Sequence, residues 1–268
     1  MKTVIMIPAR YASQRYQGKP LAQLKGPDGT TQTLIERSWR AAMTVQGVDA
    51  VYVVTDDDRI ADTARGFGAQ VIMTDPSCEN GTARVAQAMA RAEIDADVVI
   101  NFQGDAPLTP HWFVTALIDA MAADPDVQMA TPIVRCDATT LAYFYADRKA
   151  DKVGGTTAVM GHGNRALYFS KEVIPYIAPG QIPDPVPVFH HVGVYAYRPK
   201  ALVAYGSWPT GPLEALEGLE QLRFLENGTP VTCVEVETHG RLFWELNNPP
   251  DVARIEAAMV ENARHDPI

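Results

Sequence analysis

Three cationic side chains follow the first apolar run of the chain at short intervals. They lie in the stretch IPARYASQRYQGKP (7–20) and are Arg10, Arg15 and Lys19. Guanidinium and ammonium groups stay charged near neutral pH, and both bind phosphate oxygens. The stretch also contains small residues that would let backbone N–H groups approach an anion closely, namely Ala12, Ser13 and Gly18. A triphosphate cradle is therefore one interpretation, and a solvated loop with three surface cations is the other.

Short apolar runs recur in the N-terminal part of the chain, as they do in the strands of a parallel sheet. They are TVIMI (3–7), AVYVVT (50–55), QVIMT (70–74) and DVVINF (97–102). The stretches between them are typical of helices, and include TLIERSWRAAM (33–43), RIADTARGFG (59–68) and TARVAQAMARAEI (82–94). Strands that alternate with helices predict an α/β fold with a mostly parallel sheet and helices on both of its faces.

Polar loops follow each of the four predicted strands. These loops are residues 10–19, 56–58, 80–84 and 103–107. Ligands of open parallel sheets bind where the carboxyl ends of the strands lead into helices. The four loops are therefore expected to converge on one edge of the sheet. This placement makes the triphosphate cradle as strong an interpretation as the solvated loop.

The sequence pattern changes after about residue 135. Proline and glycine become frequent, and the strand-like pieces RALYFS (165–170) and HHVGVYAYR (190–198) lie among irregular stretches. We expect residues 135–205 to form a smaller inserted β-rich lobe, and residues 1–134 and 206–268 to form the α/β domain. The last part predicts an amphipathic helix over 212–228, a strand over 230–236 and a closing helix over 249–265.

Composition restricts the class of protein. The chain has 268 residues, and its 23 Lys and Arg against 32 Asp and Glu give a net charge of −9. This balance argues against nucleic acid or an anionic membrane as a partner. The three cysteines, Cys78, Cys136 and Cys233, have no metal-ligand spacing. No apolar run reaches the ~18 residues of a membrane span, and MKTVIMIPA is not typical of a signal peptide. We expect a cytoplasmic protein.

The cation loop resembles the signature P-A-R-x-x-S-x-R-x-x-x-K-P-L of the sugar-acid cytidylyltransferases, and most closely that of the 3-deoxy-manno-octulosonate (Kdo) cytidylyltransferases. Six further segments resemble those of the family and follow in the same order along nearly the whole chain. They are TDDDRIAD, NGTARVAQ, NFQGDAPL, ALYFSKEVIP, HHVGVYAYR and PLEALEGLEQLRFLENG. The chain is identified as a divergent member of this family because the seven segments agree in order.

The resemblance implies a nucleotide-diphospho-sugar transferase fold and a homodimer that uses Mg²⁺ in lipopolysaccharide biosynthesis. The implied reaction transfers CMP from CTP to Kdo or a related 2-keto acid and releases pyrophosphate. It assigns nucleotide binding to Ala9, Arg10, Ala12, Ser13, Arg15, Lys19, Asn80, Gly81, Thr82, Arg84 and Gln103. It assigns acceptor binding to Gln103, His191, Tyr195, Glu217 and Gln221. It assigns catalysis to Arg10, Lys19 and Asp105, and metal binding to Asp105 and Asn247. The inserted lobe would help to close the sugar site and to form the dimer.

The chain departs from the family most clearly at Asn247, because LNNPPDV stands where the family has V-D-T-P-E-D-L. An amide keeps an oxygen of similar reach but lacks the charge, so weaker Mg²⁺ binding is expected. Glu245 is expected on another strand face and Asp251 matches a different family residue, so neither is an obvious replacement.

Most other departures lie on the acceptor side. They are Gln17, Ala83, Ala106, Thr157, Lys171 and His190. Such changes indicate either an altered acceptor, for example an amino-Kdo, a nonulosonate or a small phosphonate, or a homologue that binds CTP or a CMP-sugar without turnover.

Three further patterns have ordinary structural interpretations. GHGNRA (161–166) fits a dinucleotide-binding pattern, but a strand-like stretch follows it where that pattern needs a helix, so no such site is expected. His190 and His191 would face opposite sides of a strand, which argues against a zinc site. The carboxylates of TDDDR (55–59) could suggest a metal cluster, although helix capping is favoured.

Overall fold

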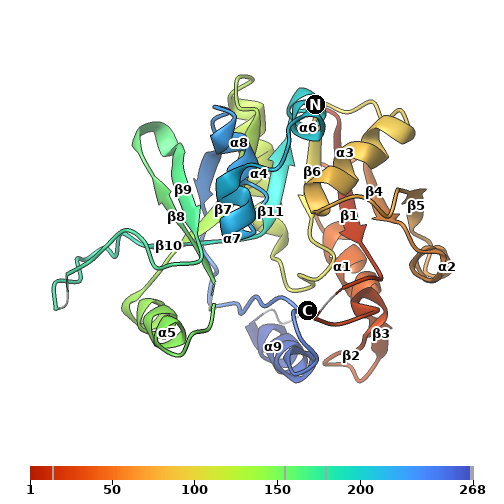
Figure 1. Cartoon of the computed structure of the whole chain (residues 1–268). Helices are drawn as coiled ribbons and strands as arrows, with labels where there is room; N and C mark the ends of the chain where they lie inside the picture. Colours follow the sequence, from red (N-terminus) through yellow and green to blue (C-terminus); the bar gives the residue numbers. More distant parts are fainter. Residues whose placement is uncertain (14, 154, 179, 266–268) are drawn as a thin grey trace.

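The computed structural model describes residues 1–13, 15–153, 155–178 and 180–265. In this part of the chain a ten-stranded sheet forms the centre of the molecule (Figure 1). Its strands are β1 (Thr3–Ala9), β4 (Ala50–Thr55), β5 (Gln70–Met73), β6 (Val98–Phe102), β7 (Met129–Arg135), β8 (Thr156–Met160), β9 (Ala166–Ser170), β10 (Phe189–His191), β11 (Val194–Tyr197) and β12 (Thr232–Glu235). A separate antiparallel pair consists of β2 (Gln23–Lys25) and β3 (Thr31–Thr33).

The parallel half of the sheet has the order β5-β4-β1-β6. All seven residues of β1 and all five of β6 are buried, as expected for strands with helices on both faces. The four apolar runs therefore form the four predicted strands, and their carboxyl ends lie at one edge of the sheet.

The other half of the sheet is mainly antiparallel and continues in the order β11-β7-β10-β8-β9, with β12 parallel to β7. β11 lies between β6 and β7 and pairs with both. The expected lobe, residues 135–205, does not begin and end between elements. Residue 135 is the last residue of β7, and residue 205 lies inside the helix at Pro199–Ser207. The backbone hydrogen bonds of β11 thus place part of the expected lobe in the centre of the sheet.

Helices cover both faces of the parallel half. They are α1 (Leu34–Met43), α2 (Asp58–Gly66), α3 (Gly81–Arg91) and α4 (His111–Ala123). Alternate residues of β1 face opposite sides: Ile5 and Ile7 belong to the same core cluster as Phe113 of α4, while Met6 belongs to a second cluster with Val85 of α3. The expectation of helices on both faces is confirmed.

The remaining helices are α5 (Ala138–Lys149), α6 (Pro199–Ser207), α7 (Pro212–Glu217), α8 (Leu222–Glu226) and α9 (Asp251–His265). The expected single helix over 212–228 is wrong, because Gly218 adopts a left-handed conformation with φ of 63° and ends α7. The chain turns at this point before α8 begins. Glu217 is therefore the last residue of α7, and Gln221 lies in the turn before α8.

Two of the alternative patterns are settled by the fold. GHGNRA forms the turn of the hairpin between β8 and β9, with no helix after it, so it is not a dinucleotide-binding loop. The side chain of Asp57 accepts a hydrogen bond from the N–H of Arg59 and caps α2, so capping is confirmed. Within the described residues, every helix is too short or too polar to span a membrane.

Candidate functional site

The cation loop leaves the end of β1 and returns to a 3-10 turn at Lys19–Leu21. The N–H groups of Ser13 and Gly18 both donate to the carbonyl of Tyr11, at 2.9 Å each. Gly18 has a left-handed φ of 69°, and a Cβ there would lie 3.0 Å from the Tyr11 ring, so the position requires glycine. The sequence predicted that these two N–H groups would approach an anion. In the structure they instead form hydrogen bonds within the loop.

The cationic side chains of the loop reach two different segments. The Lys19 Nζ donates to Asp105 Oδ2 at 2.6 Å, and the Arg15 Nη2 donates to Asn247 Oδ1 at 2.9 Å. Arg10 is exposed. The loop therefore brings two of its cations to the residues that were expected to bind the metal.

Gln103 and Asp105 follow the end of β6 directly. Gly104 lies between them, and a Cβ there would be 2.6 Å from the Pro8 carbonyl oxygen, so only glycine lets the chain pass β1 this closely. Gln103 Nε2 donates to Glu220 Oε1 at 3.2 Å, and the same amide lies 3.3 Å from the position of a Cβ on Gly81. The loops after β1, β5 and β6 thus meet at one edge, as predicted.

The start of α3 is held mainly by internal contacts. Asn80 Oδ1 accepts from the N–H of Ala83 and caps the helix, and its Nδ2 donates to Tyr205 Oη at 2.7 Å. The N–H of Thr82 donates to Glu220 Oε2 at 2.9 Å, and its hydroxyl meets Tyr197 Oη at 2.8 Å. Thr82 is fully buried, whereas Asn80, Gly81 and Gln103 are half-buried and keep some surface that a nucleotide can reach.

Arg84 lies on the inner face of α3. Only 2% of its surface is exposed, its guanidinium hydrogen-bonds to Thr74 and it pairs with Asp56 at 3.3 Å. The prediction that Arg84 contacts the nucleotide therefore has no support in this geometry. The arginine links the loop after β4 to α3 through Asp56, and so it stabilises the position of that loop at the sheet edge.

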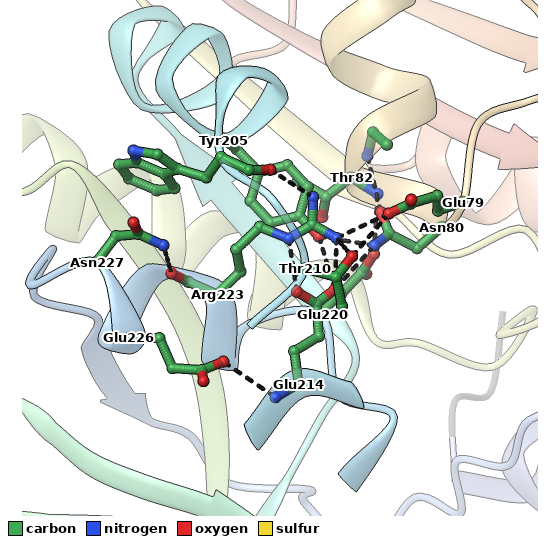
Figure 2. Close-up of polar contacts among 12 residues, drawn as sticks. Glu79, Asn80, Thr82, Tyr205, Thr210, Glu214, Glu220, Arg223, Glu226 and Asn227 are labelled. Atoms are coloured by element: carbon green, nitrogen blue, oxygen red, sulfur yellow. Dashed lines mark hydrogen bonds and ion pairs between the residues drawn. The ribbon is translucent and has the colours of Figure 1, made fainter. Parts of the chain in front are cut away.

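A charged network behind α3 was not recognised from the sequence. Figure 2 shows Arg223 of α8 between Glu214 of α7 and Glu79. Arg223 Nη2 donates to Glu214 Oε1 at 2.8 Å and to Glu79 Oε2 at 3.0 Å. Glu214 Oε1 also accepts from Asn80 Nδ2 at 3.2 Å. Glu79 directly precedes the segment NGTARVAQ, and Glu214 lies within PLEALEGLEQLRFLENG. Their place in or beside segments that resemble the family was the one sequence feature that could have pointed to this network.

The expected acceptor residues form two groups. His191, Tyr195 and Gln221 are buried, Tyr195 Oη donates to Gln221 Oε1 at 3.2 Å, and the His191 ring lies 5.7 Å from that of Tyr195. The Gln221 Nε2 is a buried donor with no partner in the described structure. Glu217 instead accepts from Ser170 Oγ and from the N–H of Lys171, at 2.7 Å and 3.0 Å.

The two adjacent histidines have separate surroundings. His191 hydrogen-bonds to Thr131 Oγ1 at 2.9 Å, while His190 stacks on Phe243. Burial lowers the pKa of His191 to about 3, so the ring is neutral near pH 7. Among the described residues no three His, Cys, Asp or Glu side chains gather as a metal cluster.

Glu245 corrects a further expectation. Residues 241–247 do not form a regular strand, and the N–H of Leu246 donates to the Asp105 carbonyl at 2.9 Å. Partial enclosure of the carboxylate by protein and the charge of Asp105 raise the pKa of Glu245 above its ordinary value, while Lys19, Asn247 and Arg15 act in the opposite direction. Strand alternation therefore does not apply, and Glu245 belongs to the same site as Asp105.

The donor set at this site fits a hard divalent cation. Asp105 and Glu245 supply carboxylate oxygens and Asn247 supplies an amide oxygen, which are the ligand types that Mg²⁺ prefers. Few protein ligands suffice for Mg²⁺ because phosphate oxygens and water complete its shell. By contrast, Asp251 accepts from the N–H groups of Asn247 and Asn248 and so shapes the loop.

Residues 4–238 match the family described as Cytidylyltransferase. The chain is 44% identical over 257 residues to a 3-deoxy-manno-octulosonate cytidylyltransferase of Maricaulis maris. The alignment covers 96% of each of the two chains. The chain belongs to this cytidylyltransferase family.

Other members support the assignment. An 8-amino-3,8-dideoxy-manno-octulosonate cytidylyltransferase of Shewanella frigidimarina is 36% identical over 259 residues, covering 96% of this chain and 98% of that one. The solved structure of a CMP:2-keto-3-deoxy-manno-octonic acid synthetase complexed with CTP superposes with a TM-score of 0.83 at 32% identity, covering 98% and 100% of the two chains. The family and the fold class inferred from the seven segments are confirmed.

Proposed function

We propose that this cytidylyltransferase transfers CMP from CTP to Kdo or a closely related 2-keto sugar acid. The observation that carries the proposal is the meeting of the cation loop with Asp105 at the carboxyl ends of β1 and β6, where Lys19 lies 2.6 Å from the carboxylate. Relatives that are named as cytidylyltransferases of Kdo or of 8-amino-Kdo align with 96% of this chain.

The anomeric hydroxyl of the sugar acid attacks the α-phosphorus of CTP. A new P–O bond forms to the anomeric oxygen, which loses its proton, and the bond to the β-phosphate breaks as pyrophosphate leaves. Arg10, Arg15 and Lys19 bind and orient the triphosphate and offset its charge. We expect Gln103, whose amide lies beside Gly81, to contact the cytosine.

Mg²⁺ is the proposed cofactor, and Asp105 would hold it next to the phosphates. When bound, it supplies Lewis-acid neutralisation of the phosphate oxygens. The Lys19 ammonium pairs with Asp105 in the structure and would be free to bind the triphosphate if a divalent cation were held by that carboxylate.

The acceptor is proposed to bind near His191, Tyr195 and Gln221. The unpartnered Nε2 of Gln221 is a donor for a sugar hydroxyl or carboxylate, because a buried donor without a partner is costly. The neutral His191 ring can bind a polyol without adding charge. A homodimer, with residues 135–205 helping to close the sugar site, and a cytoplasmic location belong to the same proposal.

The test is pyrophosphate release from CTP with Mg²⁺ or Mn²⁺. The acceptor panel contains Kdo, 8-amino-Kdo, sialic acid and small phosphonates, and ATP, GTP and UTP serve as nucleotide controls. Release that requires CTP and either Kdo or 8-amino-Kdo supports the proposal and identifies the acceptor. Release only with a phosphonate would replace the acceptor class, and CTP binding without release in any arm would favour the non-catalytic alternative that Asn247 suggested.

A further inference from the structure

The amide that replaces the family aspartate is already engaged. Asn247 Oδ1 accepts from Arg15 Nη2 at 2.9 Å, and the side chain also hydrogen-bonds to Glu245. The backbone N–H of Asn247 donates to Asp251 Oδ2 at 3.1 Å. Asn247 is therefore oriented by its neighbours toward the cation loop, where it restrains Arg15.

Glu245 is placed beside Asp105 by the backbone. Leu246 is fully buried in a core cluster that includes Leu24, Leu34 and Ile255, and its N–H donates to the Asp105 carbonyl at 2.9 Å. The buried leucine and this hydrogen bond together fix the segment against the loop after β6. Neighbouring residues on either side of Leu246 then project toward the site.

The side chain of Glu245 reaches over the start of β11. Its Oε1 lies 3.3 Å from the position of a Cβ on Gly193, and the stem of Gln103 lies 3.7 Å from the same position. A side chain larger than that of glycine at 193 would crowd the carboxylate. The Glu245 carboxylate is thus directed at the end of β6, and the residue remains exposed to solvent on its open side.

The charge balance at the site favours a divalent cation once a triphosphate is bound. Asp105 and Glu245 carry the two carboxylates, and Lys19 and Arg15 are close enough to act on the charge of Glu245. When a triphosphate engages the two cations, the two carboxylates are left with less compensation. A divalent cation held by Asp105 and Glu245 would compensate this negative charge.

We propose that Glu245 supplies the second carboxylate for the divalent cation in this chain, and that Asn247 is a positioning residue for Arg15. This inference rests on the proposed function for the presence of a cation at Asp105. It replaces the expectation that Asn247 itself is the metal ligand and that the site is therefore weak.

The test is Mn²⁺ binding to the full chain in the presence of CTP, measured by the electron paramagnetic resonance signal of free Mn²⁺. Glu245→Gln is expected to weaken Mn²⁺ binding at least about tenfold, because one of two charged ligands is lost. Glu237→Gln is the matched control, since Glu237 is exposed on the same segment, and it should leave the affinity unchanged. Unchanged affinity in Glu245→Gln would overturn the proposal.

Two further variants separate a ligand from a distant charge and from Asn247. Glu245→Asp keeps the charge but withdraws the carboxylate by one methylene, so a several-fold loss is expected of a ligand, and full retention would mean that only the charge matters. If Glu245→Gln leaves Mn²⁺ binding unchanged while Asn247→Ala weakens it, the ligand role belongs to position 247 and the proposal is overturned.

Thermal denaturation and CTP binding without metal provide the folding controls for each variant. If the unmodified chain binds Mn²⁺ with CTP and Glu245→Gln does not, but no acceptor yields pyrophosphate, then the carboxylate assignment stands and the transfer reaction fails. If the unmodified chain binds no Mn²⁺ in the presence of CTP, the carboxylate assignment fails.

Discussion

Lys19 and Asp105 restrain each other at the point where the cation loop meets β6. Their side chains are 13% and 26% exposed, so the pair is partly shielded from water and the charges interact more strongly than on an open surface. The ammonium is therefore held at the place where a triphosphate would lie. Removing the Lys19 ammonium would leave Asp105 without its partner and would also remove a cation from the expected triphosphate site.

Lys19→Gln is expected to weaken CTP binding by about 10- to 100-fold, which corresponds to the loss of a charge-assisted hydrogen bond. Isothermal titration with CTP and Mg²⁺ measures this effect. Lys25→Gln is the control, because Lys25 is an exposed lysine of β2 away from the site. Equal affinity in the Lys19 variant and the control would mean that the loop is a solvated loop, as the alternative interpretation holds.

At the scale of elements, three segments distant in sequence are joined by one buried guanidinium. Arg223 of α8 binds Glu214 of α7 and Glu79 before α3, and Glu214 in turn contacts Asn80 (Figure 2). The side chains of Arg223 and Glu214 are only 5% and 7% exposed. The position of the α3 start therefore depends on a buried ion pair.

Arg223→Met is expected to lower the free energy of unfolding by about 3–5 kcal/mol, since it leaves the Glu214 carboxylate buried without its partner. Urea denaturation measures the change. Arg65→Met removes an exposed pair with Asp62 and should cost less than about 0.5 kcal/mol. Similar losses in both variants would contradict a special role for the buried pair.

At the scale of the whole molecule, the half-buried His190 and the buried His191 couple stability to pH. Burial lowers the pKa of His190 to about 4 and that of His191 to about 3, from 6.5. Below pH 6.5 the unfolded chain binds protons that the folded chain does not, so stability falls as the pH falls. Each group contributes about 1 kcal/mol per pH unit between pH 6 and its folded pKa.

His191→Gln should therefore flatten the loss of stability between pH 6.5 and 5 relative to the unmodified chain. Glutamine can keep a hydrogen bond to Thr131, so the variant is expected to fold. Urea unfolding at several pH values gives the slopes, and His162→Gln, at an exposed turn position, is the comparison. The idea fails if the slope of the His191 variant equals that of the unmodified chain.

The sequence by itself determined those features that depend on local pattern. The strands β1, β4, β5 and β6 were predicted because continuous apolar runs are typical of strands buried on both faces. The cation loop and Gln103 were found for the same reason, since they follow such runs directly. The family could be identified because its segments keep their residues and their order.

Only the tertiary structure decided features that depend on contacts between distant segments. β11 lies inside the main sheet through its pairing with β6, Arg84 is buried against Asp56, and the left-handed Gly218 separates α7 from α8. Glu245 joins Asp105 through the hydrogen bond of Leu246, in a segment that has no regular strand. A periodic pattern reports which face a residue takes within its own element, and it carries no information on which distant backbone that element meets.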